Sequence, residues 1–529
     1  MEKYSHTLFL ALGAEARCAM SDSDGSDGRS ASAGTAAPLG RTLGRGMLFS
    51  GIGLVMVQTV SLGQTLAIAH LLSPTEVGLF AAGTVLSTFL LTITANCLGS
   101  ALVQREAEVE DAANTVLYTS VIIGLISSLI ALASAPLIGA VFHSSTAGLI
   151  AFAISGTILL QSCTVVPDYL MQRRFNFRRR LVVGPASAIT YAVVAVVLAA
   201  KGFGVWSLVI GSYAGVAAWV ISTWSLARWR PGHGRVSLRL LVELVRYALP
   251  ALIASIAWQA RDLVETVVVG RALSETNLGL YRYGRRLSML PGVAIVQIAS
   301  YVLFPAFARI AGDTVRFKQA FLRALTALWF VATPVAALTV AVGEPLVVVL
   351  LGERWRGAGV AFVAMSGFGL GEALGAVGQE SIMGSGKSRL FNAVTVVHVV
   401  SGVGLLLLLI RFGLPGVGLA ISISALLMGV TAILRARRVV GASVREILGC
   451  LITPVVASVI ALLAIGSIEY FVVHSDRRGL AVGAGLLVGE SVLFVIIYLA
   501  TMRLIAPRML VSLSSEVRSA LLKSRRTAV

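Results

Sequence analysis

The segment QTVSLGQTLAIAHLLSPTEVGLF, residues 58–80, recurs in altered form as QARDLVETVVVGRALSETNLGLY at residues 259–281. In the central part, LSPTEVGLF (72–80) and LSETNLGLY (273–281), five of nine positions are identical. Each copy contains an apolar run, a short polar turn and the start of a second apolar run. Transporters are often built from duplicated halves with the substrate site between them. The offset of 201 residues has room for six spans, so it predicts two halves of like orientation.

A weaker echo joins GFGVWSLVI (202–210) to GLPGVGLAI (413–421). Each segment lies in a short turn between two apolar runs. Glycine-rich turns also resemble one another by chance, and this alternative remains open for the second pair.

The composition is that of a membrane protein. Of the 529 residues, 57% are hydrophobic and 13% charged, and the mean hydropathy is +0.88. A bilayer core about 30 Å thick needs roughly 20 apolar residues per helix, and runs of that length recur from residue 47 to 502. We therefore expect an all-α integral membrane protein with about fourteen transmembrane helices, near residues 47–70, 78–102, 115–141, 146–167, 181–200, 204–226, 247–270, 286–308, 320–342, 357–382, 390–410, 414–434, 447–468 and 480–502.

The repeat divides these helices into two six-helix bundles and two further helices. The N-terminal region is rich in Ser, Gly and Asp and is expected to be disordered. The expected organisation is a disordered cytoplasmic tail 1–46, a first bundle 47–226, a basic cytoplasmic linker 227–246, a second bundle 247–438, two additional helices 439–502 and a basic cytoplasmic tail 503–529.

Basic residues orient the chain, because Lys and Arg are enriched in cytoplasmic loops. With both termini inside, the inside segments hold most of the 43 Lys and Arg residues. The net charge of +18 is explained by topology and by contact with anionic membrane lipid, since the basic residues alternate with apolar runs instead of gathering as in a nucleic-acid site. The basic loop expected at 271–286 disagrees, because it places Arg271, Arg282, Arg285 and Arg286 outside.

Several ordered patches resemble bacterial polysaccharide biosynthesis flippases, O-antigen flippases included. They are the 58–80 segment, LGSALVQREAEVEDAANTVLY (98–118), PDYLMQRRFNFRRRLVV (167–183) and KGFGVWSLVIGSYAG (201–215). These flippases belong to a superfamily that also contains multidrug and toxin extrusion transporters and the lipid II flippase. The resemblance implies two bundles around a central cavity, and outward movement of undecaprenyl-diphosphate-linked sugars across the bacterial cytoplasmic membrane.

The family pattern of an Asp in helix seven, a Gly and then L-G-x-Y is matched by Asp262, Gly270 and Leu278–Tyr281. The first half keeps Gly78 and Phe80 but has Ser61 where Asp262 aligns. A chemical role shared by the two halves is therefore in doubt.

Ionisable residues inside spans are the strongest functional pointers, because a charge in lipid is costly and almost always faces a cavity or a partner. Arg261, Asp262 and Glu265 lie on one side of helix seven. They are predicted either to line a hydrated cavity, with Arg261 attracting a diphosphate, or to form a structural ion pair. Gln58, Gln64 and Asn96 are further cavity candidates that could bind sugar hydroxyls or merely join helices.

Two other groups of residues complete the predicted site. Glu372 lies in a glycine-rich helix, GFGLGEALGAVGQESIMG (367–384), and is a candidate coupling carboxylate. Arg173, Arg174 and Arg178 are candidates for recruiting the lipid head group, although topology alone already explains them. Glu490 lies outside the duplicated core and is expected to be structural or tied to a lipid groove.

Catalysis, cofactors and metals have no support in the sequence. GSGKS (384–388) lacks the first glycine of a P-loop, because that position is Ser381, and the four cysteines form no C-x-x-C pair. The leading hypothesis is a flippase for a polyprenyl-diphosphate-linked sugar, with a polymerase and glycosyltransferases as possible partners. The alternatives are a small-molecule or drug exporter of the same superfamily and, with less support, a membrane glycosyltransferase or polymerase or a scaffold.

Overall fold

The computed structural model describes residues 36–96, 98–105, 107–173, 177–232, 234–387 and 390–511. Within these ranges all regular structure is helical and no strand is present. Ten of the described stretches are long and apolar enough to cross a membrane. One of them, residues 391–440, contains two helices. The predicted all-α membrane fold is therefore confirmed, while the number fourteen stays a prediction.

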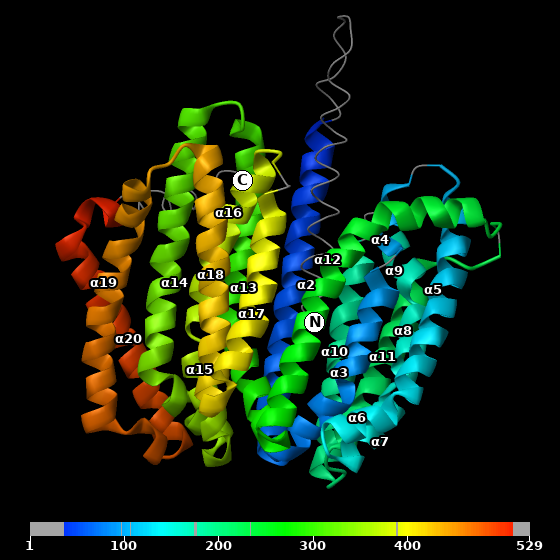
Figure 1. Cartoon of the computed structure of the whole chain (residues 1–529), viewed down its shortest axis with the longest axis horizontal. Coiled ribbons are helices and arrows are strands. Elements are labelled where there is room, and N and C mark those ends of the chain that lie inside the picture. The colour runs from blue at the N-terminus through cyan, green and yellow to red at the C-terminus, as the bar shows by residue number, and fades with distance from the viewer. Residues whose placement is uncertain are drawn as a thin grey trace, which may run out of the picture. The chain divides into compact units, whose positions relative to one another are not determined.

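The chain divides into two compact units, residues 1–279 and 280–529 (Figure 1). In the first unit, α3 packs against α5, α7, α8 and α12, and α10 packs against α2 and α11. Its helices are α2 (Ala36–Leu71), α3 (Pro74–Asn96), α4 (Gly99–Gln104), α5 (Val109–Ala133), α6 (Ala135–Val141), α7 (Ser145–Ile154), α8 (Gly156–Ser162), α9 (Val165–Arg173), α10 (Phe177–Ala200), α11 (Trp206–Ala227) and α12 (Leu238–Ala272).

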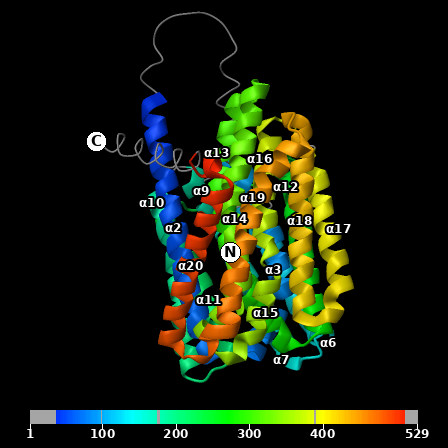
Figure 2. The same cartoon turned by 90° about the vertical axis from the view of Figure 1, so that its left-hand side faces the viewer.

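In the second unit, α18 packs against both α16 and α17, and α14 packs against α19 and α20 (Figures 1 and 2). α13 (Glu275–Ile310) begins four residues before the boundary between the units. The later elements are α14 (Thr314–Leu351), η1 (Glu353–Trp355), α15 (Arg356–Ala364), α16 (Gly367–Gly384), α17 (Phe391–Leu409), η3 (Ile410–Phe412), α18 (Gly413–Val440), α19 (Val444–Ile468), η4 (Glu469–Val473), η5 (Ser475–Arg477) and α20 (Leu480–Ile505).

The repeated sequence folds into repeated local structure. Ser73 precedes α3, and its hydroxyl accepts a hydrogen bond from the Glu76 N–H while the Glu76 carboxylate accepts one from the Ser73 N–H. This is a capping box, with Pro74 at the first helical position, where its missing N–H costs nothing. At the equivalent position, the Ser274 hydroxyl caps α13 by accepting from the Asn277 N–H. The two LS segments are therefore helix starts in both copies.

The two helix starts also cross each other, and both lie within residues 1–279. The hydroxyls of Thr75 and Thr276, 201 residues apart, are hydrogen-bonded at 2.8 Å. A side chain on Gly78 would collide with the backbone carbonyl of Glu275, and one on Gly279 with that of Pro74. The contact is reciprocal, as expected where two copies of one motif meet about a local twofold axis.

Glycine also decides the packing of α16 on α18. Gly367, Gly371, Gly375 and Gly378 lie along one side of α16, and a Cβ added at each would meet Ser422, Ala425, Met428 or Ala432 of α18. Small residues at such spacing let two membrane helices approach closely. The glycines of α16 therefore permit its close approach to α18.

Three expectations differ from the structure. The loop expected at 271–286 is wrong, because α12 ends at Ala272 and α13 begins at Glu275. Hydropathy ended the span at the arginines, but a capped helix continues through them. Residues 36–46, expected in the disordered tail, are helical in α2; residues 1–35 and 512–529 lie outside the described residues. The structural division falls after Gly279 and not at the expected 246/247, because α12 packs against α3.

Replacing Gly78 with Ala should lower the thermal stability of the purified protein. Overpacking against fixed backbone costs about 1–3 kcal/mol. Gly63 of α2 is a matched control, because nothing lies within 4 Å of an added Cβ there. Gly63→Ala should be neutral or should stabilise the helix by up to roughly 1 kcal/mol. The measurement is thermal unfolding in detergent, and equal melting temperatures for the two variants would contradict the crossing.

Candidate functional site

The centre of the candidate site is the charged turn of α12. The Arg261 and Glu265 side chains are 9% and 5% exposed, and their Nη2 and Oε1 atoms lie 4.0 Å apart. Asp262, one residue after Arg261, is half-buried, and its backbone carbonyl accepts a hydrogen bond from the Thr266 hydroxyl at 2.9 Å. Helical spacing places these groups in the middle of an otherwise apolar stretch. The predicted proximity of Arg261 and Glu265 is therefore present in the structure.

The Arg261–Glu265 contact is long for an ion pair. Charge-assisted hydrogen bonds between a guanidinium and a carboxylate are typically about 2.7–2.9 Å long. Burying a charge in lipid is costly unless it is paired or faces a polar cavity. The Arg261 guanidinium and the Glu265 carboxylate are therefore close to each other but do not form a short bidentate hydrogen bond with each other.

α3 supplies a wall beside this turn. The Gln259 side-chain amide donates to the Thr88 carbonyl at 3.5 Å. The hydroxyls of Thr84, Thr88 and Thr92 each donate a hydrogen bond to the backbone carbonyl four residues earlier in α3. Farther along α12, Gly270 packs against the Phe142 ring. The charged turn is consequently held on a helix that is anchored on both sides.

The remaining cavity candidates of the first unit are placed less closely. Gln58 and Gln64 are half-buried on α2. Asn96 is the last residue of α3, and its side chain lies outside the described part of the structure. Among the described contacts none joins Gln58 or Gln64 to Arg261. Their roles in binding sugar remain predictions.

In the second unit, Glu372 is half-buried on α16. Its Cγ lies 3.8 Å from the place of a Cβ on Gly292, so it borders α13. The arginines at positions 282, 285 and 286 are also half-buried in α13. Sequence reasoning missed them by assigning them to a loop. The repeat could have found them, because Ser274 aligns with the helix cap Ser73.

Of the predicted recruitment residues, Arg173 has a structural task. It ends α9, and its guanidinium donates to the backbone carbonyls of Leu102, Val103 and Arg105, where α4 ends. It thereby satisfies carbonyls that the helix leaves unpaired. Arg174 lies outside the described residues, and Arg178 is described only as part of the α10 backbone.

Comparisons with known proteins identify the family of the chain. Residues 67–359, more than half of the chain, match the model of a family described as polysaccharide biosynthesis protein. The chain belongs to that family. Over 288 residues it is 28% identical to the succinoglycan biosynthesis transport protein ExoT of Rhizobium meliloti. That match covers 54% of this chain and 58% of ExoT, so the chain spans less than two thirds of that relative.

Solved structures show the same fold. The lipid II flippase MurJ in an inward closed conformation superposes with a TM-score of 0.72 at 15% identity, covering 88% of this chain and all of that one. An inward-facing multidrug resistance MATE family transporter superposes with a TM-score of 0.59 at 17% identity, covering 75% and 98%. This polysaccharide biosynthesis family member is therefore a multi-pass helical membrane protein with a transporter fold.

The predicted cytoplasmic linker is fixed to the first unit by polar contacts. The backbone N–H groups of Gly232, Arg235 and Ser237 donate to the side chains of Asn114, Asp111 and Thr115 at the start of α5. The Trp229 indole donates to Glu110 at 2.9 Å. The linker therefore follows α5 closely before α12 begins.

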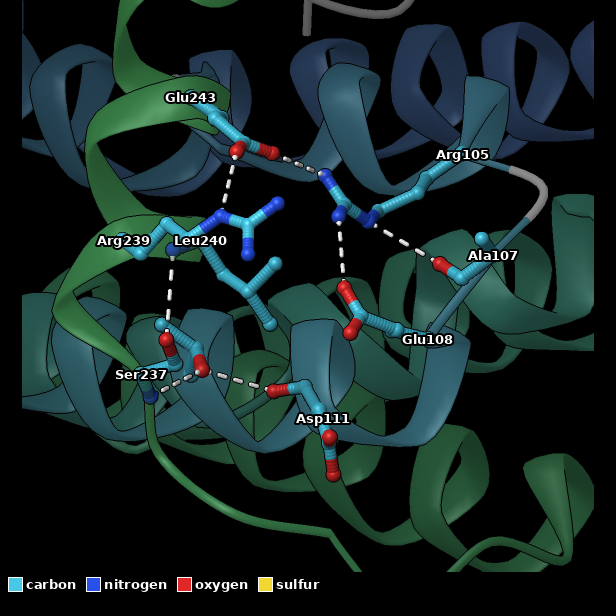
Figure 3. A network of polar contacts seen from close by, with 9 residues as sticks. Arg105, Ala107, Glu108, Asp111, Ser237, Arg239, Leu240 and Glu243 are labelled. Carbon is cyan, nitrogen blue, oxygen red and sulfur yellow. Dashed lines mark hydrogen bonds and ion pairs between the residues drawn. The ribbon is translucent and has the colours of Figure 1, made fainter.

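Beside the linker, Arg105 joins α12 to the segment before α5 (Figure 3). Its guanidinium contacts Glu243 at 3.0 Å and Glu108 at 3.1 Å, and Arg239 contacts Glu243 at 3.2 Å. The hydrogen bond from Arg105, followed by that from Arg239, lowers the pKa of Glu243 below its ordinary value of 4.5. Glu243 in turn raises the pKa of Arg105.

Replacing Glu243 with Gln should destabilise the start of α12 at neutral pH and have little effect in acid. A carboxyl whose pKa is lowered by folding contributes stability above its ordinary value, and loses that contribution as the pH falls through the lowered value. The measurement is hydrogen exchange of residues 238–247 in wild type and variant from neutral pH downward. The exposed Arg239→Gln variant should have a smaller effect. A difference between wild type and Glu243→Gln that is constant with pH would contradict the pairing.

Proposed function

We propose that this protein is a flippase that translocates undecaprenyl-diphosphate-linked oligosaccharide across the bacterial cytoplasmic membrane by alternating access. Both termini are proposed to be cytoplasmic. Family membership and the name of the ExoT relative support transport in polysaccharide biosynthesis. The likeness to the lipid II flippase supports a fold suited to moving a lipid-linked head group.

The observation that carries the proposal is Arg261, with a nearly buried guanidinium in the middle of an apolar helix. Arginine matches the geometry of phosphate oxygens through its planar fork and keeps its charge at any physiological pH. The half-buried Arg282, Arg285 and Arg286 of α13 add positive charge on a second helix. Basic groups in spans favour an anionic substrate over the cations that many drug exporters carry.

The three parts of such a substrate would be bound in different ways. The diphosphate would be attracted by Arg261, and the sugar hydroxyls would bind amides such as those of Gln58 and Gln64. The prenyl tail would stay in lipid, because withdrawing it costs about 0.8 kcal/mol per methylene group. No covalent bond changes in this cycle, and the protein supplies binding and access only.

Arg261→Gln tests this role, paired with Glu265→Gln so that no buried carboxylate is left alone. The double variant should reach the membrane and melt near the wild type, and polymer export should fall by about tenfold or more, as when one charged hydrogen bond of about 1.5–3 kcal/mol is lost. Arg239→Gln, on the exposed start of the same helix, is the matched control. Full export by the double variant would remove Arg261 from substrate binding.

The substrate class is best identified by native mass spectrometry of the gently purified protein. A bound polyprenyl-diphosphate sugar in the wild type, diminished in the double variant, would support the proposal and identify the sugar. Bound cationic small molecules, with no lipid-linked sugar, would favour a drug exporter of the same fold.

A further inference from the structure

The helical hairpin formed by α19 and α20 buries two carboxyl groups. Glu469 follows α19 as the first residue of η4, a π-helical turn, and Glu490 lies ten residues along α20. Each residue is 5% exposed. Single π-helical turns are rare in proteins, and those that occur are often found at functional sites. α14, α19 and α20 pack together in the second unit (Figure 2).

Glu469 is held by the loop that closes the hairpin. Its Oε1 accepts from the backbone N–H of Ser475 at 2.9 Å and from the Ser475 hydroxyl at 2.6 Å. The next residue, Asp476, binds Arg356 at 2.7 Å. The loop is also pressed against α20, since a Cβ on Gly483 would lie 2.6 Å from the Ser475 carbonyl oxygen.

Glu490 has no such support. Among the described residues neither of its carboxyl oxygens has a hydrogen-bond partner within bonding geometry, and the same holds for Oε2 of Glu469. The group that acts on Glu490 is the Glu469 carboxyl itself. Side chains lean toward the start of their own helix, so the side chains of a residue at the end of α19 and a residue within antiparallel α20 converge.

No described basic group neutralises this pair. The ionisable groups on α14 and on the hairpin are Arg316, Lys318, Arg323, Glu344, Arg445, Glu446, Tyr470, His474, Asp476, Arg477, Arg478, Tyr498 and Arg503, and Glu353, Arg354 and Arg356 follow α14. None of the ion pairs found among the described residues includes Glu469 or Glu490. Arg356 is occupied by Glu344, Glu353 and Asp476 at 2.6–2.7 Å, and Tyr498 donates to the Phe330 carbonyl at 2.9 Å. Two neighbouring carboxyl groups buried in an apolar place strongly disfavour a second negative charge.

We propose that Glu469 and Glu490 form a proton-binding site in the C-terminal hairpin, in which Glu490 carries the proton and Glu469 bears the charge. The assignment follows from Ser475, whose two donors stabilise an anion on Glu469 and offer nothing to Glu490. Releasing the proton places two negative charges together and pushes η4 away from α20. Binding of the proton is thereby linked to the closure of the hairpin. This proton site is separate from Arg261 and does not depend on the identity of the transported substrate.

The first test is labelling with dicyclohexylcarbodiimide, an apolar reagent that modifies protonated carboxyl groups. The full-length protein in lipid nanodiscs is labelled over a range of pH and digested, and adducts are located by mass spectrometry. Glu490 should be modified at neutral pH and lose reactivity as the pH rises. Glu446, paired with Lys318 at 2.8 Å on the same helical hairpin, is the control and should stay unmodified.

Two variants separate the roles of the glutamates. Glu469→Gln should leave Glu490 protonated and reactive, whereas Glu490→Gln should remove labelling from the hairpin, because Glu469 then remains an anion held by Ser475. Gln imitates a protonated carboxyl in size, so both variants are expected to fold. Reaction at Glu469 and none at Glu490 would overturn the assignment.

The second test needs no reagent to enter the hairpin. Hydrogen exchange of residues 469–490, corrected for the intrinsic effect of pH, should accelerate with rising pH in the wild type and not in Glu490→Gln. A purely structural pair would give the same pH profile in both proteins. An identical profile, or the absence of a protonated-carboxyl infrared band that Glu490→Gln removes, would overturn the proposal.

Discussion

The lack of water in a bilayer is the constraint from which the rest of this structure follows. Each backbone N–H and C=O inside lipid needs an internal partner, and only helices provide one locally. Once every segment is a helix, apolar side chains no longer distinguish the protein interior from lipid, and association depends on close packing. Glycine then becomes a packing residue, as along α16 and at the crossing of the two helix starts.

That crossing also shows how duplication gives a fold its symmetry. Ser73 and Ser274 cap equivalent helices, and Gly78 and Gly279 each admit the other copy's backbone. Deeper in the helices, Thr65 and Thr266 bond to the carbonyls of Ser61 and Asp262 in the same way. The copies share backbone geometry, while their side chains at the charged turn differ. The two copies share the local scaffold, and Arg261, Asp262 and Glu265 are present in the second copy alone.

The same constraint makes the surroundings of charged side chains informative, and three arrangements are present in the structure. Arg356 is fully engaged by three carboxylates and holds a loop in place. Arg261 lies 4.0 Å from the Glu265 carboxylate within one turn of the same helix. Glu469 and Glu490 are buried in the hairpin, and among the described residues the Ser475 donors are the hydrogen-bond partners of Glu469, which is the basis of the proposed proton site.

Sequence alone determined the fold class, the duplication and the charged turn, because each depends on local pattern: apolar length, a recurring motif and i,i+4 spacing. It misplaced Arg282, Arg285 and Arg286, since hydropathy cannot tell a basic loop from a basic helix that faces other helices. It could not pair Glu469 with Glu490, nor assign Arg173 to the end of α4, because these contacts join residues distant in the chain. Such pairings depend on how helices pack, and only the tertiary structure decided them.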